Sequence, residues 1–205
     1  MTRAFHELYG VADAFGQVEF SGRSDRAIFR DAAAAHGVPA GDSERHRFID
    51  AYVPRLTAAL QETSGRLMPG IEAALAAFAG MADVVQGLGT GNFRRTGEAK
   101  LVYYGISSYF PGAVGGFGDD HDERNELIRI GIERLRNGYE RAGRVVIIGD
   151  TPHDVAAAKA NGAYALGVAT GKDSVADLLA CGADASLEDL SDTELVLKLV
   201  LGTRG

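Results

Sequence analysis

The sequence predicts an α/β protein with a doubly wound parallel sheet, and two observations favour this class. After residue 66, short apolar runs alternate with stretches of helical periodicity, a pattern that places parallel strands side by side with helices over both faces. Before residue 66, only helical patterns occur. The expected organisation is therefore a small helical domain at 1–65 and an α/β core domain at 66–205.

The N-terminal helices are predicted from apolar spacing and from residues that cap helix ends. Ser24 or Asp25 can begin the second helix, because short polar side chains accept hydrogen bonds from the first free amides of a helix. The third helix has apolar residues at three- and four-residue spacing. The expected helices span 2–9, 26–36 and a third segment that begins at Asp42 or Ser43 and includes Phe48, Ile49, Tyr52, Val53, Leu56 and Leu60.

The core domain is expected to alternate between helices and strands. Asn161-Gly162 is a typical helix stop, and the apolar runs on either side of the helix that it ends predict a β-α-β unit. The helix that begins at Asp122 should turn Leu127, Ile130, Ile132 and Leu135 inward. The expected helices are 70–78, 96–105, 122–139, 154–162, 173–180 and 192–201, the strands are 81–88, 145–149, 163–169 and 185–187, and a glycine-rich loop spans 111–118.

Two carboxylates mark the end of a predicted strand. Asp150 follows the apolar run at 145–149 directly, and Asp154 lies four residues later, in the first turn of the next helix. In open α/β sheets, ligands bind at the carboxyl ends of the strands. Mg²⁺ takes one or two carboxylates and completes its octahedron with water and phosphate oxygens. The pair therefore predicts a Mg²⁺ site, and the alternative interpretation of Asp154 is a helix cap.

Composition excludes several classes of function. The 205 residues are 46% hydrophobic and 24% charged, as in a soluble globular protein, and no apolar stretch approaches the roughly 20 residues of a membrane span. The net charge is 21 − 28 = −7, which disfavours nucleic acid as a partner. The N-terminus lacks the apolar centre of a signal peptide, and a single cysteine, Cys181, fits a reducing compartment. A cytoplasmic protein is expected.

A second strand end carries a hydroxyl group. The segment Gly87–Asn92 has the appearance of a dinucleotide fingerprint, but Asn92 stands where that pattern requires glycine. The Thr90 hydroxyl and the open backbone amides beside it suit a phosphate group instead. An ordinary turn between strand and helix explains the same residues.

Together these features resemble the haloacid dehalogenase (HAD) superfamily, whose members are mostly phosphatases. The segment at 1–65 resembles the family's small helical cap, and Gly89–Asn92 is similar to its second motif, which holds the phosphoryl group. Gly149–Asp154 is similar to the fourth motif, whose acids bind Mg²⁺. The third motif usually contributes a lysine, and here Arg124 and Lys100 are the two candidates.

The resemblance implies Mg²⁺-dependent hydrolysis of a small phosphorylated metabolite through an aspartyl-phosphate. Thr90, with the Gly91 and Asn92 amides, would orient the phosphoryl group, and Asp150 and Asp154 would hold the metal. Arg124 or Lys100 would add positive charge. In the cap, the polar segment 22–25 would choose the substrate through Arg23, although this segment also reads as an ordinary helix start.

The sequence departs from the family at its first motif, an apolar strand that ends in Asp-x-Asp and supplies the nucleophile. None of the aspartates here follows such a strand, and Asp83 is expected to begin a strand rather than end one. We therefore expect one strand and its turn, roughly 20 residues, to be missing before Met1. The chain itself should then be inactive and marginally stable. The alternatives are a non-catalytic relative that binds Mg²⁺ or phosphate, and a phosphomutase.

Overall fold

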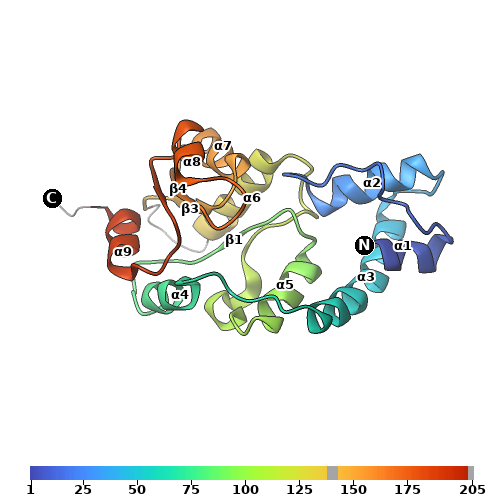
Figure 1. The fold of residues 1–205 in the computed structure, drawn as a ribbon, viewed down its shortest axis with the longest axis horizontal. Coiled ribbons are helices and arrows are strands. Elements are labelled where there is room, and N and C mark those ends of the chain that lie inside the picture. Colours follow the sequence, from blue (N-terminus) through green and yellow to red (C-terminus); the bar gives the residue numbers. More distant parts are fainter. Residues whose placement is uncertain (138–142, 203–205) are drawn as a thin grey trace.

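The computed structural model describes residues 1–137 and 143–202, and it confirms an α/β protein with parallel strands in which helices predominate (Figure 1). No helix in these ranges is long and apolar enough to cross a membrane. The helices are α1 (Thr2–Tyr9), α2 (Asp25–Ala35), α3 (Asp42–Glu62), α4 (Ile71–Ala79), α5 (Arg94–Tyr103), α6 (Arg124–Arg136), α7 (Pro152–Ala160), α8 (Val175–Ala180) and α9 (Thr193–Leu201), with short 3-10 turns η1 (Ser107–Tyr109) and η2 (Pro111–Ala113). The strands are β1 (Leu88–Gly89), β2 (Gly115–Gly116), β3 (Val146–Gly149), β4 (Tyr164–Val168) and β5 (Ala185–Leu187).

Helices α1, α2 and α3 gather at one end of the molecule and share an aromatic core (Figure 1). Phe5, Phe29 and Phe48 are each at most 1% exposed. The rings of Phe29 and Phe48 are stacked, with centroids 4.6 Å apart, and such pairs stabilise beyond the burial of their area. We refer to α1–α3 as the helical unit, because its apolar stripes face one another.

The helical unit shows one correct and one wrong prediction of a helix start. Ser24 begins α2 as predicted and accepts a hydrogen bond from the Ala27 amide at 3.1 Å. Helix α3 begins at Asp42, but the prediction that Asp42 or Ser43 caps it is wrong, because the N-cap is Gly41 and no side chain caps the helix. Asp42 lies in the first turn instead, where its charge is favourable against the helix dipole.

The strands form two separate parallel sheets. In the smaller sheet β1 pairs with β2, and Leu88 lies opposite Gly115. In the larger sheet β4 lies between β3 and β5, and Val146 lies opposite Tyr164. Within the ranges that the structure describes, no ladder joins β1 to β3, so each of these strands has one unpaired edge.

Strand β2 lies in the segment predicted to be a glycine-rich loop, and that prediction is wrong. Glycine disfavours strands, but here it permits close backbone contact. A Cβ atom at Gly115 would lie 2.1 Å from the Leu88 carbonyl oxygen, and one at Gly116 would lie 1.9 Å from the Leu127 carbonyl oxygen. Helix α6 therefore packs directly on the backbone of β2, which sequence propensity cannot show.

This packing predicts that Gly116→Ala destabilises the fold. The new methyl group would press on the Leu127 carbonyl of α6, and overpacking against backbone costs about 3 kcal/mol. Thermal unfolding followed by circular dichroism measures the effect. Gly143→Ala is the matched control, because a Cβ atom there meets nothing within 4 Å. Equal melting temperatures for the two variants would contradict the packing described here.

The predicted strand at 81–88 is also wrong for most of its length, since only Leu88 belongs to β1. Met81 and Val84 pack in an irregular segment against the cluster formed by α4, α9 and the end of β4. Asp83 lies in a turn rather than at the start of a strand. These apolar residues therefore contribute to the core without forming the hydrogen-bond ladder of a strand.

Helix α6 spans the two sheets. Gly131 sits on β2, where a Cβ atom would lie 2.7 Å from the Gly116 nitrogen. Leu127 is buried as predicted, together with Ile128, and both cluster with Ala157 of α7. The predicted inward residue Ile130 is only partly buried, and the predicted helix end near Tyr139 lies outside the described residues.

Strand β3 is poorly covered for an apolar strand. Ile148 of β3 is 40% exposed, whereas Leu166 of the neighbouring β4 is 1% exposed. Ile147 reaches the α6 cluster only as a partly buried residue. The larger sheet is therefore well buried at its central strand β4 and partly exposed to solvent at β3.

Candidate active site

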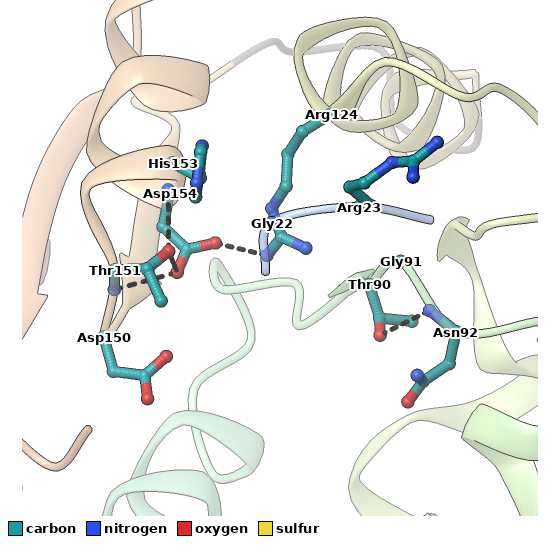
Figure 2. A pocket seen from close by; sticks show the side chains of 10 residues that line it. All are labelled: Gly22, Arg23, Thr90, Gly91, Asn92, Arg124, Asp150, Thr151, His153 and Asp154. Carbon is teal, nitrogen blue, oxygen red and sulfur yellow. Dashed lines mark hydrogen bonds and ion pairs between the residues drawn. The ribbon is translucent and has the colours of Figure 1, made fainter. Parts of the chain in front are cut away.

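The carboxyl ends of β1 and β3 open into one pocket beside the helical unit (Figure 2). Its volume is about 220 Å³. Thr90 follows β1 and Asp150 follows β3, and both line this pocket. The pocket is lined by Gly22, Arg23, Thr90, Gly91, Asn92, Arg124, Asp150, Thr151, His153 and Asp154.

The pocket has an acidic corner formed by Asp150 and Asp154. Asp150 follows β3, and within the described ranges no side chain or amide donates to its carboxylate. Asp154 is 6% exposed and forms a capping box with Thr151, whose hydroxyl donates to Asp154 Oδ2 at 2.7 Å. Asp154 therefore does take part in capping α7, as the alternative interpretation predicted. The Asp150 carboxylate, in contrast, is free to bind a ligand.

Two glycines make room for these carboxylates. A Cβ atom at Gly149 would lie 2.3 Å from Asp154 Cβ, and one at Gly171 would lie 2.7 Å from Asp150 Oδ2. A side chain at either position would force the neighbouring carboxylate to move, so glycine lets the loop after β4 pass beside Asp150 in its present orientation. Gly171 is a site-shaping residue that strand and helix patterns alone do not single out.

Arg124 reaches the acidic corner from the first residue of α6 (Figure 2). Its guanidinium forms an ion pair with Asp154 Oδ1. The two side chains are 24% and 7% exposed, so this pair is largely removed from solvent. The Arg124 Nε atom is buried without a partner in the described structure, which leaves donor capacity for an anion.

The loop after β1 presents the hydroxyl and amides expected for a phosphate site. The Thr90 amide donates to the Gly116 carbonyl at 3.0 Å, which fixes the loop to β2. The Asn92 amide donates to Thr90 Oγ1 at 3.1 Å. Lys100 does not line the pocket, and its ammonium donates to Asn92 Oδ1 at 2.8 Å from behind the loop.

On the opposite side, the helical unit contributes Arg23 and Gly22. Arg23 lines the pocket but is already paired with Asp31 at 2.5 Å. Gly22 has a positive φ of 70° and lies against the His153 ring, where a Cβ atom would be 2.3 Å from Cδ2. His153 received no role from sequence reasoning, and its position between the two acids is the signal that could have suggested one.

The pocket gathers the predicted side chains Thr90, Arg124, Asp150 and Asp154 with Arg23, and it leaves Lys100 outside. The described residues contain no group of three or more histidine, cysteine or acidic side chains that could hold a metal. A single free carboxylate with water and phosphate still suits Mg²⁺, which needs few protein ligands. The donor set of the acidic corner therefore fits Mg²⁺ on Asp150, with Asp154 held back by its cap and ion pair.

Comparison with known proteins agrees with this geometry. Residues 125–193, which contain both acids, match the HAD-hydrolase-like family. The matched segment is about a third of the chain, and within it the chain is similar to this family. No curated protein matches it at a significant level.

Solved structures of HAD-like proteins share its fold over nearly the whole chain. A conserved HAD-like protein of unknown function from Agrobacterium tumefaciens is 15% identical, and the match covers 98% of this chain and 89% of that one, with a TM-score of 0.55. A putative beta-phosphoglucomutase from Thermotoga maritima is 20% identical over 97% and 92%, with a TM-score of 0.57. CbbY from Rhodobacter sphaeroides, solved with xylulose-(1,5)bisphosphate, is 22% identical over 93% and 87%, with a TM-score of 0.60.

Proposed function

We propose that this HAD-like chain carries the scaffold of a Mg²⁺-dependent phosphomonoester hydrolase. Residues 1–65 form its cap domain and residues 66–205 its core. The observation that supports this most strongly is the pocket, which faces a hydroxyl-and-amide loop toward a free carboxylate and a buried arginine. Phosphoryl transfer depends mainly on positioning and on charge stabilisation, and these groups supply both.

Each side chain has a distinct role in the proposal. The Thr90 hydroxyl and the Gly91 amide orient the phosphoryl oxygens, and the Asn92 amide holds the Thr90 oxygen in place. Mg²⁺ held by Asp150, and by Asp154 through water, would neutralise charge between the phosphoryl group and an attacking carboxylate. The pocket geometry suits these roles because the loop and the acids lie on opposite walls.

Arg124 is the third-motif cation in this proposal. It lines the pocket and keeps an unpartnered Nε–H near the acids, whereas Lys100 lies behind the loop. Arg124 therefore adds positive charge near the phosphoryl group and holds Asp154 in place. Lys100 orients the Asn92 side chain and acts on the substrate only through it.

The nucleophile belongs to a strand that we place between β1 and β3. Both strands present an unpaired edge, α6 contacts both sheets, and the strand ends of both sheets open into the same pocket. A parallel strand in this space would pair with both edges and would bring its carboxyl end into the pocket. An Asp-x-Asp sequence at that end would supply the nucleophile and the general acid.

The substrate class that fits is a small phosphate ester. A cavity of about 220 Å³ is smaller than the roughly 300–1,000 Å³ of drug-sized ligand sites. Two arginines line the pocket, Arg23 beside the helical unit and Arg124 at the start of α6, each paired with an aspartate. A compact phosphorylated metabolite, with one polar group near Arg23, matches this size and charge.

The first test is phosphate release from p-nitrophenyl phosphate with Mg²⁺, using the 205-residue chain and its Asp150→Asn variant. No release from folded protein is expected, because the proposed nucleophile is not among these residues. Release that disappears in the variant would mean that a carboxylate of this chain is the nucleophile. A separate titration with inorganic phosphate distinguishes the alternatives. A chain that binds phosphate but releases none from the ester is a non-catalytic relative or a mutase, whereas a chain that binds no phosphate is an inert fold.

We further predict that Gly171→Ala weakens Mg²⁺ binding. The methyl group would lie 2.7 Å from Asp150 Oδ2 and would turn the carboxylate away from the pocket. Displaced metal-site geometry typically reduces affinity by about 10- to 100-fold. Calorimetric titration with Mg²⁺ measures the change, and Gly143→Ala serves as the control. Unchanged affinity would show that Asp150 is not the metal ligand.

A further inference from the structure

The helical unit contacts the loop after β1 through one residue, Asp25. The Asp25 amide donates to the Gly91 carbonyl at 2.7 Å, and the Phe93 amide donates back to Asp25 Oδ2 at 3.0 Å. The Thr96 hydroxyl lies 3.3 Å from the same oxygen. Asp25 of α2 therefore forms hydrogen bonds with both Gly91 and Phe93, the two ends of this short segment.

This arrangement completes the start of α5 from another helix. In a capping box, the third residue of a helix accepts a hydrogen bond from the N-cap amide. The N-cap of α5 is Phe93, and the third residue is Thr96, which does not accept from that amide. Asp25 of α2 accepts instead, so the helix that follows the phosphate loop is capped by the helical unit.

Asp25 is buried, which makes its contacts energetically important. Its exposed fraction is 6%, and a buried carboxylate is tolerated only where hydrogen bonds satisfy it. Burial raises the pKa of the Asp25 carboxyl, while the Phe93 amide and the charge of Lys100 act in the opposite direction. Loss of Asp25 would leave the Phe93 amide unpaired in the interior.

Apolar packing holds the same loop. Phe93 is fully buried and belongs to the aromatic core of the helical unit, with its ring centroid 6.4 Å from that of Phe48. Gly91 has no room for a side chain, because a Cβ atom would lie 2.8 Å from the Arg23 carbonyl oxygen. The loop is therefore attached to the helical unit at both of its ends.

We propose that Asp25 is a positioning residue for the phosphate-binding loop. The inference rests on the proposed function, because it assigns phosphate to Thr90 and Gly91. Asp25 lies outside the pocket lining and touches no substrate. It sets the direction of the loop amides, so the domain proposed to choose the substrate also controls how tightly phosphate is held.

The test compares Asp25→Ala, Asp25→Asn and Ser24→Ala in the 205-residue chain. Inorganic phosphate is titrated calorimetrically, and amide exchange and chemical shifts of residues 91–93 are followed by NMR without phosphate. Asp25→Ala should weaken phosphate binding about tenfold, the factor that one hydrogen bond of ordinary strength provides. Asp25→Asn keeps an acceptor oxygen and should restore most of the affinity.

Ser24→Ala is the matched structural control. Ser24 is 3% exposed and caps α2 through the Ala27 amide, so its loss lowers stability while the Asp25 carboxylate that accepts from the Phe93 amide remains. It should leave phosphate affinity and the exchange of the Phe93 amide unchanged. Equal phosphate affinity and equal Phe93 exchange in Asp25→Ala and the parent chain would overturn the inference.

The phosphate titration and the amide-exchange measurement test the proposed function and this inference separately. If the parent chain binds no phosphate, the assignment of the loop to phosphate fails. Faster exchange of the Phe93 amide in Asp25→Ala, but not in Ser24→Ala, still supports Asp25 as the residue that positions the loop. Unchanged exchange refutes it, whatever the phosphate titration gives.

Discussion

An N-terminal extension that carries an apolar strand ending in Asp-x-Asp is expected to stabilise this protein and to make it a phosphatase. The strand would pair with the open edges of β1 and β3. A few added hydrogen bonds at about 1 kcal/mol each give roughly 4 kcal/mol, which corresponds to a rise of about 10 °C in melting temperature. Phosphate release should rise by on the order of 10⁶-fold over the uncatalysed reaction.

The N-terminus is well placed for such an extension. The amino group of Met1 is partly buried and lies within electrostatic range of Asp25 and Lys100, so burial lowers its pKa while Asp25 raises it. Asp25 contacts the phosphate loop directly. The Met1 amino group therefore lies near the contact between Asp25 and the loop after β1, which is outside the pocket lining.

One variant separates the two effects of the extension. Replacing the first aspartate of the added Asp-x-Asp by asparagine keeps the backbone pairing and removes the nucleophile. Melting temperature should stay high while phosphate release returns to background. An extension that raises neither stability nor turnover would show that the space between β1 and β3 does not accept a strand.

Asp150→Asn is expected to remove Mg²⁺ binding and, in the extended protein, catalysis. The Asp150 carboxylate has no donor among the described residues, so the substitution changes little besides the metal ligand. A neutral amide oxygen is a far weaker ligand for a hard cation, and we expect affinity to fall by about 100-fold or more. Calorimetry with Mg²⁺ alone tests this without any substrate.

Asp154→Asn provides the comparison. Asp154 closes the capping box of α7 and pairs with Arg124, so its loss should lower the melting temperature as well as the metal affinity. Asp150→Asn should leave the melting temperature without Mg²⁺ almost unchanged. If Asp154→Asn proves the more damaging to Mg²⁺ affinity, the direct metal ligand is Asp154 and the proposed division of roles is reversed.

The parts of the fold that were predictable have strong local signals. The unit from β3 through α7 to β4 combines apolar runs with a helix stop, and its boundaries agree with the structure to within a few residues. Ser174 and Asp192 begin α8 and α9 by accepting hydrogen bonds from the first turns of those helices. Local chemistry decides such boundaries, so one sequence is sufficient to find them.

The parts that were not predictable depend on contacts distant in sequence. Strand β2 consists of glycines that permit the close approach of β1 and α6, and apolar residues near Met81 pack without forming a ladder. In the site, the strand-end rule brought Thr90 and Asp150 together, but His153 and Gly171 became visible only once the loops were placed. Asp25 looked like a helix cap, and its partners are in another helix.

The burial of Phe93 in the helical unit limits how this protein can be recombined. A chimera that exchanges residues 1–65 for the equivalent segment of a relative would leave Phe93 facing a surface that did not evolve to receive it. A graft that carries residues 90–96 together with the new helices keeps both sides of that contact. The unit of exchange therefore includes the loop after β1 as well as the helical unit, because Phe93 packs in the core of that unit.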